Sequence, residues 1–203
     1  MKRFERRWGE LLSGAVLGLA LAGGTAMAQA PAPVPPPQRP GQPEVKAVDD
    51  WFVRCFPVQS PSPCDIFEEL DDQRSRQRVL AISIAYVPSL DRYALQITVP
   101  LEVSIPKGMT IQTDSYTSPV LRYRRCDRNG CYVETAVDKT MIEALTKSGP
   151  EGKVNIVADN GKSFALRFYL KGFSAAHDEM VSEAKAKAKP VEKTAPLPVP
   201  ENR

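Results

Sequence analysis

The feature that most constrains the fold is a pair of cysteines on either side of a tight turn, within residues 118–137, SPVLRYRRCDRNGCYVETAV. Asn129 and Gly130 lie between two runs rich in Val, Leu and Tyr, and Asn-Gly between apolar runs is a strong β-hairpin signal. Cys126 and Cys131 then face each other at a Cα separation of about 4.5 to 5.5 Å, which suits a disulfide. The stretch therefore predicts a disulfide-bonded hairpin in an exported protein, because such bonds persist in oxidising compartments.

The other two cysteines, Cys55 and Cys64, are predicted to pair with each other. Four cysteines permit three pairings, and the hairpin accounts for two of the four. The segment between Cys55 and Cys64 contains Pro57, Pro61 and Pro63, which suit a tight bend joining two strands. A long-range bridge would restrict the unfolded chain more, but hairpin closure is fast and local, so we expect the two local bridges. Zinc sites and thiol oxidoreductases are not indicated, since no Cys-x-x-Cys spacing occurs.

The first 28 residues have the organisation of a cleaved signal peptide. Four basic residues precede an apolar run over residues 11–22, and the sequence Ala-Met-Ala at residues 26–28 follows as a cleavage site. An uncleaved membrane anchor is the alternative, but Gly-Gly-Thr at residues 23–25 argues against it. The Arg pair at residues 6–7 resembles a twin-arginine signal, although such a pair more often supplies charge alone. We therefore expect the mature chain to start at Gln29 without a membrane span.

Two segments flank the folded domain that we predict over residues 45–180. Residues 29–44 form a linker in which half of residues 30–43 are proline, typical of a polyproline II spacer. Residues 181–203 are rich in Lys and Pro and are expected to fray from a helix into a disordered tail. Because residues 1–28 hold four basic and two acidic side chains, the mature net charge is +1. This balance favours neither nucleic acid nor an anionic membrane as a partner.

The domain itself is patterned as a series of short strands. β-forming residues and apolar alternation predict strands at residues 51–56, 64–70, 79–86, 93–99, 103–105, 109–113, 153–158 and 163–170. Residues 138–147 are instead typical of a short helix, with Asp138 as its N-cap and three apolar residues at helical spacing. Strands at this spacing, with turn residues between them, indicate an all-β sandwich or barrel.

Several of these features follow one another in a characteristic order. After the signal come Trp-x-Val-x-Cys at residues 51–55, a second cysteine at Cys64, and the segment PLEVSIPKGMTIQTD at residues 100–114. The predicted disulfide-bonded hairpin, the short helix and the sequence LKGFS at residues 170–174 complete the order. This order resembles the invasion-associated locus B family of exported bacterial proteins over almost all of the domain. One departure is Tyr-Leu before the lysine of the last motif, where a Ser-Leu pair is expected.

The resemblance implies a fold, a location and a biological role. The fold is an immunoglobulin-like antiparallel β-sandwich, here with one short helix before the last two strands and a C-terminal helical segment. The location is the periplasm or the outer cell envelope. In some intracellular pathogens the family has a part in host-cell invasion, and so in virulence. No catalytic residue carries over, because the family has no established chemistry.

Enzymatic chemistry finds little support in the residues themselves. His177 is the single histidine, and its neighbours Asp178 and Glu179 are expected to face other directions, so we interpret it as a surface histidine. A histidine-based triad or a His-rich metal site would have to be built on that one ring. The carboxylate pairs at residues 68–69 and 71–72 are not distinguishable from a solvated loop. We therefore expect no catalytic residue, no cofactor and no metal.

Two classes of function stay open on this basis. The leading one is a non-enzymatic envelope protein that binds another macromolecule, either a protein or an envelope component, through a sheet face or an edge strand. The alternative is a periplasmic small-ligand or glycan-binding module that uses Arg122, Tyr123 and Arg124 as its ligand face. An exposed apolar patch would favour the first class, and a concave pocket lined by Tyr and Arg would favour the second.

We predict that the exported protein begins at Gln29, because Ala26 and Ala28 satisfy the small-residue requirement of signal peptidase. N-terminal mass spectrometry of a periplasmic fraction measures this directly. Recovery of residues 1–28 intact in the membrane fraction would contradict the prediction and support the anchor.

Overall fold

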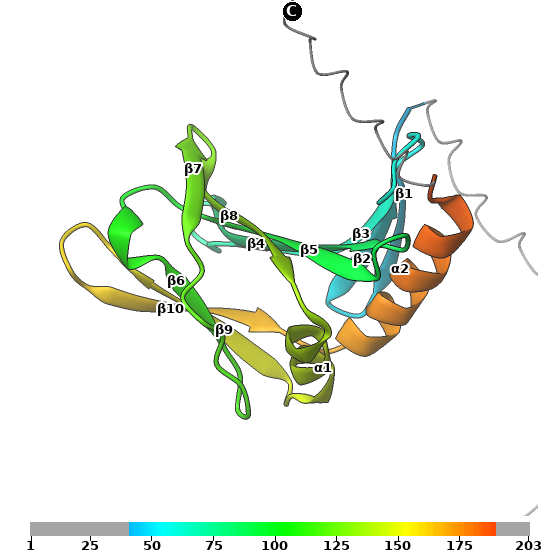
Figure 1. The fold of residues 1–203 in the computed structure, drawn as a ribbon. Coiled ribbons are helices and arrows are strands. Elements are labelled where there is room, and N and C mark those ends of the chain that lie inside the picture. Colours follow the sequence, from blue (N-terminus) through cyan, green and yellow to red (C-terminus); the bar gives the residue numbers. More distant parts are fainter. Residues whose placement is uncertain (1–40, 190–203) are drawn as a thin grey trace, which may run out of the picture. The chain divides into compact units, whose positions relative to one another are not determined.

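The computed structural model describes residues 41–189, which form two antiparallel β-sheets and two α-helices (Figure 1). The predicted signal peptide, the linker up to residue 40 and the tail beyond residue 189 lie outside the described residues. Between residues 41 and 189, neither α-helix is long and apolar enough to cross a membrane.

The larger sheet has seven strands in the order β1-β2-β3-β4-β5-β8-β7, so its first five strands form a simple meander. Its strands are β1 Glu44–Val48, β2 Trp51–Cys55, β3 Cys64–Asp71, β4 Arg78–Val87, β5 Arg92–Val99, β7 Tyr123–Asp127 and β8 Gly130–Val137. The smaller sheet has the order β10-β9-β6, with β6 Met109–Gln112, β9 Glu151–Val157 and β10 Ser163–Tyr169. The helices are the 3-10 turn η1 Ile105–Lys107, α1 Lys139–Lys147 and α2 Phe173–Lys187.

The hydrophobic core lies on one face of the larger sheet, against the smaller sheet and the helices. Alternate residues of the central strands are buried, because successive side chains of a strand point to opposite faces. The smaller sheet contributes Met109, Ile111, Val154, Ile156 and Phe168 to this core, and α2 contributes Phe173, Ala176, Met180 and Ala184. The apolar alternation that predicted the strands therefore faces one shared interior.

The predicted all-β fold of antiparallel strands is confirmed, with one short helix before the last two strands and a helical C-terminal segment. The predicted N-cap is also confirmed, since the Asp138 carboxylate accepts a hydrogen bond from the Met141 N–H at 3.1 Å. The strand expected at residues 103–105 is wrong. Val103 makes a single bridge to Ala158, and the 3-10 turn η1 follows because Pro106 has no N–H for a strand ladder.

The ends of the domain extend beyond the predicted residues 45–180. The first strand begins at Glu44, inside the predicted linker, and α2 continues to Lys187, inside the predicted tail. Helix α2 continues because Ala184 is fully buried and because the Lys187 ammonium lies 3.0 Å from Glu44 and 2.7 Å from Glu183. The helical part of the predicted tail therefore belongs to the folded domain as far as Lys187, and the rest of the predicted tail beyond residue 189 lies outside the described residues.

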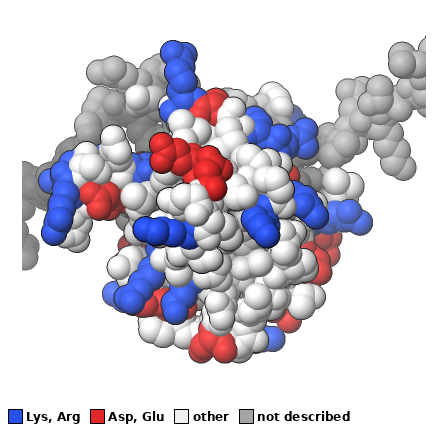
Figure 2. Space-filling model, turned by 90° about the vertical axis from the view of Figure 1, so that its left-hand side faces the viewer, with Lys and Arg blue, Asp and Glu red and all other residues white. Residues whose placement is uncertain are grey.

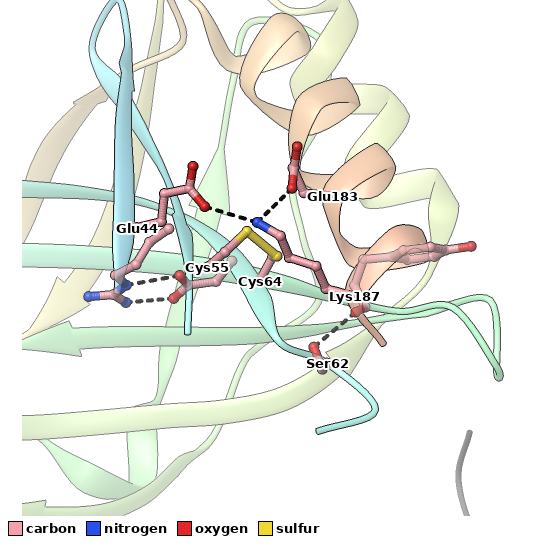
Figure 3. The surroundings of a disulfide bond; sticks show 9 residues. Glu44, Cys55, Ser62, Cys64, Glu183 and Lys187 are labelled. Carbon is pink, nitrogen blue, oxygen red and sulfur yellow. Dashed lines mark hydrogen bonds and ion pairs between the residues drawn. A yellow bond between two sulfur atoms is a disulfide. The ribbon is translucent and has the colours of Figure 1, made fainter. Parts of the chain in front are cut away.

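Both predicted disulfides are confirmed. Cys55 and Cys64 are register partners of β2 and β3 with their Cα atoms 4.1 Å apart, and Cys126 and Cys131 join β7 to β8 at 4.0 Å. Figure 3 shows the first bridge beside the C-terminal turn of α2, where the side chain of Lys187 lies between β1 and the helix. One disulfide therefore fastens the β2–β3 hairpin, next to the edge strand β1, and the other fastens the β7–β8 hairpin at the opposite edge of the larger sheet.

Two turn glycines differ in the space around them, which allows a matched test of the β7–β8 hairpin. Gly130 has a φ of 138°, and a Cβ there would lie 2.3 Å from the backbone oxygen of Val99. Gly161, in the β9–β10 turn, has a φ of 83°, but a Cβ would meet nothing within 4 Å. We expect Gly161→Ala to lower the free energy of unfolding by about 1 to 2 kcal/mol through backbone strain alone. In Gly130→Ala the new Cβ must also displace the backbone of β5. We therefore expect this variant to lower the free energy of unfolding by more than about 3 kcal/mol.

Urea unfolding of the two variants and the parent protein measures this difference. Equal losses of unfolding free energy in the two variants would mean that the close approach of Gly130 to the β5 backbone does not require a glycine at this turn.

Candidate functional site

The larger sheet has one face against which no other element of residues 41–189 packs. Both α-helices and the smaller sheet lie against its opposite face, and in Figure 1 the upper side of the sheet is open between β7 and β1. We call this surface the open face. Its side chains belong to Val45, Ala47, Phe52, Arg54, Asp65, Phe67, Glu69, Ala81, Ser83, Ala85, Ala94, Gln96, Thr98, Arg125, Tyr132, Glu134 and Ala136.

A ladder of three phenylalanines and one arginine forms one side of the open face. Phe52 stands opposite Phe67 in the β2–β3 register, and their rings stack with centroids 5.2 Å apart. The Arg54 guanidinium lies 4.2 Å from the centroid of Phe67 and 5.0 Å from that of Phe56. Phe52 and Phe56 remain 38% and 37% exposed. We call these four residues the aromatic–arginine ladder.

The arginine of this ladder is held in place by a carboxylate. Nε and Nη2 of Arg54 donate to the two carboxylate oxygens of Asp65 at 2.9 and 2.6 Å, and the Ser83 hydroxyl donates to Asp65 at 2.7 Å. Such a two-bond pair fixes the guanidinium plane as well as its position. The buried Asp65 carboxylate is compensated by these three bonds. The guanidinium of Arg54 is therefore fixed in position within the ladder.

The surface at the centre of the open face lies below its two sides, because the side chains there are small. Ala81, Ser83 and Ala85 of β4 and Ala94 of β5 form a floor beside the ladder. A hollow of about 210 Å³ lies at one end of this floor, where Tyr132 of β8 forms the opposite side. The open face is thus a shallow groove with aromatic sides.

The far side of the groove is also fixed by charged contacts. The Arg125 guanidinium lies 3.7 Å from the ring centroid of Tyr132, and its nitrogens contact Glu134 at 3.1 Å and Asp127 at 2.7 Å. Cys131, next to Tyr132 in the chain, is bonded to β7. Each side of the groove therefore lies on a disulfide-bonded hairpin.

The three residues predicted as a ligand face are not brought together. Arg122 donates to the carbonyl of Pro106 at 3.2 Å, and Arg124 lies 3.3 Å from Glu134. The hydroxyl of Tyr123 is buried and has no hydrogen-bond partner among the described residues, and burial raises the pKa of this tyrosine to about 12. Adjacent residues of a strand point to opposite faces, so Tyr123 turns away from the two arginines.

The charged groups at this end of the molecule are mixed. Figure 2 shows basic side chains interspersed with acidic ones and separated by uncharged surface on the side that lies at the left in Figure 1. The arginines of β7 belong to this pattern, since Arg124 and Arg125 are both paired with Glu134. The visible surface therefore offers no broad basic patch for a polyanion.

His177 is half-buried, so its interpretation as a surface histidine is wrong. Its side chain is 16% exposed, its Nε2 lies 2.9 Å from the Tyr93 hydroxyl, and its Nδ1 lies 3.0 Å from the Asp178 carboxylate. Asp178 therefore does not face away from the ring. The contact joins α2 to β5 across 84 residues, and no sequence pattern signals such a pairing.

These residues line a second hollow, of about 460 Å³, formed by α1, α2 and the β4–β5 turn. The Tyr86 hydroxyl donates to Asp91 at 2.9 Å, and Asp91 also pairs with Lys139. Burial raises the pKa of Tyr86 to about 12 and raises that of Tyr93 as well. Both phenols are therefore protonated at neutral pH and suit hydrogen bonding better than nucleophilic attack.

Glu68, which the sequence did not distinguish from a residue of a solvated loop, lies in the core. It is only 3% exposed, and its carboxylate accepts the backbone N–H of Tyr169 at 3.0 Å. Burial is the main cause that raises its pKa from 4.5 to about 7; the hydrogen bond from Tyr169 lowers it, and the nearby Asp50 raises it further. Glu68 connects β3 to the end of β10 and does not reach the open face.

Comparison with known proteins finds a matching family, similar sequences and a similar solved structure. A family model described as Invasion associated locus B (IalB) protein matches residues 51–181. Invasion protein B homologs from two strains of Brucella abortus are 27% identical over 132 residues, which cover 64% of this chain and 75% of each relative. The crystal structure of invasion associated protein B from Bartonella henselae matches with a TM-score of 0.62 at 20% identity. It covers 70% of this chain and 99% of that one, and at this identity it supports the fold alone.

The buried carboxylate predicts a specific pH dependence of stability. The pKa of Glu68 in the folded protein, about 7, lies above its ordinary value of 4.5. The stability that Glu68 contributes to the folded protein is therefore fully present below about pH 4.5, and it is lost as the pH rises through about 7. Glu68→Gln should remove this loss, so that at about pH 8 the variant is more stable than the parent by up to about 3 kcal/mol.

Urea unfolding between about pH 5 and about pH 8 measures this dependence. Glu69→Gln is the matched control, because its side chain is exposed on the same strand and should keep the parent's pH profile. A Glu68→Gln variant with the parent's profile would show that this carboxylate does not titrate on folding.

Proposed function

The chain belongs to the Invasion associated locus B (IalB) family, and from this premise we propose that it acts by binding another macromolecule through its open face. The aromatic–arginine ladder is the observation that carries the proposal. Aromatic and Arg side chains are enriched at protein interfaces and among the residues that dominate binding energy. Since Asp65 already holds Arg54, ordering this arginine on binding costs little further entropy.

The proposal is for a non-enzymatic protein with a protein or envelope partner. The chemistry of the second hollow supports this, because its two phenols have raised pKa values and its Lys139 is paired with Asp91. The groove itself is lined by rings, small side chains and paired charges, which suit recognition more than bond cleavage. On this proposal, no cofactor and no metal take part.

The proposed location is the periplasm or the outer cell envelope, with export by a cleaved signal peptide. Two disulfides in a domain of this size are typical of exported proteins. The Brucella relatives are named as invasion protein homologs, and this supports a part in host-cell invasion for the present chain. Comparing the entry of a deletion strain and its parent into cultured host cells tests that role.

The second candidate function is a small-ligand or glycan-binding module. The hollow at α1 and α2 favours it, because Tyr93, His177 and Lys139 direct polar groups into a space of about 460 Å³. The open face favours macromolecular binding more strongly, because its rings are exposed and already fixed in position. The two functions use different surfaces, so variants can separate them.

Replacing the exposed rings of the ladder should weaken partner binding. We expect the double variant Phe52→Gln, Phe56→Gln to lose more than about tenfold in partner affinity, because an aromatic residue at the centre of an interface contributes about 2 kcal/mol or more. Affinity capture from an envelope fraction, followed by quantitative binding of the captured partner, measures the loss.

The matched control is Phe164→Gln, since Phe164 is a comparably exposed ring on β10 of the smaller sheet. It should keep the parent's affinity. Equal binding by the double variant and the parent would remove the open face as the binding surface.

A further inference from the structure

One edge of the strand β10 is open among residues 41–189. The strand is the first of the smaller sheet, so it pairs with β9 on one side and with no strand on the other. Lys162 and Leu170 flank β10 and form backbone hydrogen bonds with the residues that flank β9. Because alternate residues of an antiparallel strand bond to the same neighbour, the odd-numbered residues of β10 bond away from β9. Within residues 163–167 these are Ser163, Ala165 and Arg167.

Tyr169 agrees with this alternation and marks the end of the open edge. Its N–H donates to Glu68 and its carbonyl accepts from the Trp51 indole, and both of these side chains belong to the larger sheet. The outward backbone groups of Tyr169 are therefore occupied. Residues 163, 164, 165 and 167 are exposed instead, and residue 166 is partly buried. We call residues 163–167 the β10 edge.

The other three edges of the two sheets are protected. The edge strand β1 has charged side chains that pair with α2, and β7 has two adjacent arginines and an irregular register. Residues 117–121 cover the outer edge of β6 through isolated bridges. Charged side chains, bulges and covering segments are the means by which proteins prevent edge strands from pairing. From Ser163 to Leu166, the β10 edge has none of them.

A second copy of the same strand fits the β10 edge. An antiparallel two-fold pairing through Ala165 is the one register in which all three outward residues face outward residues. Ala165 then faces Ala165 of the second copy, and Ser163 faces Arg167. Each of these pairs exchanges two backbone hydrogen bonds. Phe164, whose ring is 47% exposed, faces Leu166 of the second copy, so the pairing also covers an exposed apolar side chain.

The charges permit this register. Arg167 is the single charged residue of the β10 edge, and its guanidinium lies 3.9 Å from Glu151. In the paired strands the two copies of Arg167 are offset by the length of strand from residue 163 to residue 167, about 14 Å. This offset exceeds the Debye length of about 8 Å at physiological ionic strength, so their repulsion is largely screened.

Pairing at the β10 edge produces a closed dimer. A two-fold axis uses the same surface on both copies, so neither copy keeps a free β10 edge. The combined sheet has the order β6-β9-β10 in one copy and the reverse order in the other. Its two outer strands are both β6, which residues 117–121 already cover. Further copies therefore find no open edge in this sheet.

We propose that β10 pairs with β10 of a second copy through residues 163–167, so that the two smaller sheets form one continuous antiparallel sheet. This surface belongs to the smaller sheet and the open face belongs to the larger one, so either function can fail without the other. Five residues from each copy make a small interface, and we expect a dissociation constant in the micromolar range. Each dimer carries two open faces, which favours avid binding to a repetitive envelope partner.

Charge exchange at the two-fold axis tests the pairing. Sedimentation equilibrium of the exported protein from about 1 μM to about 1 mM measures the dissociation constant of the dimer. Ala165→Glu and Ala165→Lys each place like charges opposite one another, so each should raise this constant more than about tenfold. A mixture of the two variants places opposite charges together. Its heterodimers should bind more than about tenfold tighter than either variant alone, as measured by sedimentation of labelled Ala165→Glu protein with unlabelled Ala165→Lys protein.

A second variant gives a gain that unfolding does not produce. Ser163→Glu places a carboxylate opposite Arg167 at both ends of the paired strands, so it should strengthen association about threefold or more. The matched control is Ala47→Glu, because Ala47 is an exposed alanine on the edge strand β1 of the larger sheet. It should keep the parent's dissociation constant.

Three results would overturn the proposal. The first is a parent protein that stays monomeric at about 1 mM. The second is the absence of heterodimers in the mixture together with no strengthening by Ser163→Glu, whereas either effect alone supports the pairing. The third is a loss of association in Ala47→Glu equal to that in Ala165→Glu, which would place the contact on the larger sheet.

Discussion

The arrangement of the two sheets depends on the backbone of one residue, Tyr169, at the end of β10. Its N–H donates to the buried carboxylate of Glu68, and its carbonyl accepts a hydrogen bond from the Trp51 indole at 2.9 Å. Both side chains belong to the larger sheet, so they satisfy polar backbone groups just where the smaller sheet ends. The Trp51 ring also meets Phe173, the first residue of α2, edge-on at 5.0 Å. This junction holds the smaller sheet and α2 against the same face of the larger sheet.

The open face is the consequence of that one-sided packing. With the core, the smaller sheet and both α-helices on one side, the alternate side chains of the same strands remain available on the other. The disulfides hold the hairpins at both sides of the groove, and the pair of Arg54 with Asp65 holds the ladder. A surface fixed in this way binds with little loss of conformational freedom, which is the physical basis of the proposed recognition.

Helix α2 packs on the core side of the strands β2 and β3, which carry the aromatic–arginine ladder on their other side. Burial of Ala184 and the contacts of Lys187 with Glu44 and Glu183 hold the end of the helix beside β1 and the first disulfide (Figure 3). Gln42, Phe56 and Lys187 line a small hollow at this same corner. At this corner β2 contacts α2 through its core-facing side chains, and the opposite side chains of the same strand belong to the open face.

Local patterns of the sequence determined most of the strands, the helix capped by Asp138 and both disulfides, but not β1 or the 3-10 turn at residues 105–107. Alternation, turn residues and cysteine spacing act over fewer than about ten residues, where chain geometry leaves few alternatives. The pairing of Tyr93 with His177 and of Glu68 with Tyr169 was decided by tertiary structure alone, since these contacts span 84 and 101 residues. The inward turn of Tyr123 was decided in the same way, because alternation shows that neighbours face opposite sides but not which side is covered. Only the packing of the smaller sheet and α2 on one face left the other face of the larger sheet open among the described residues.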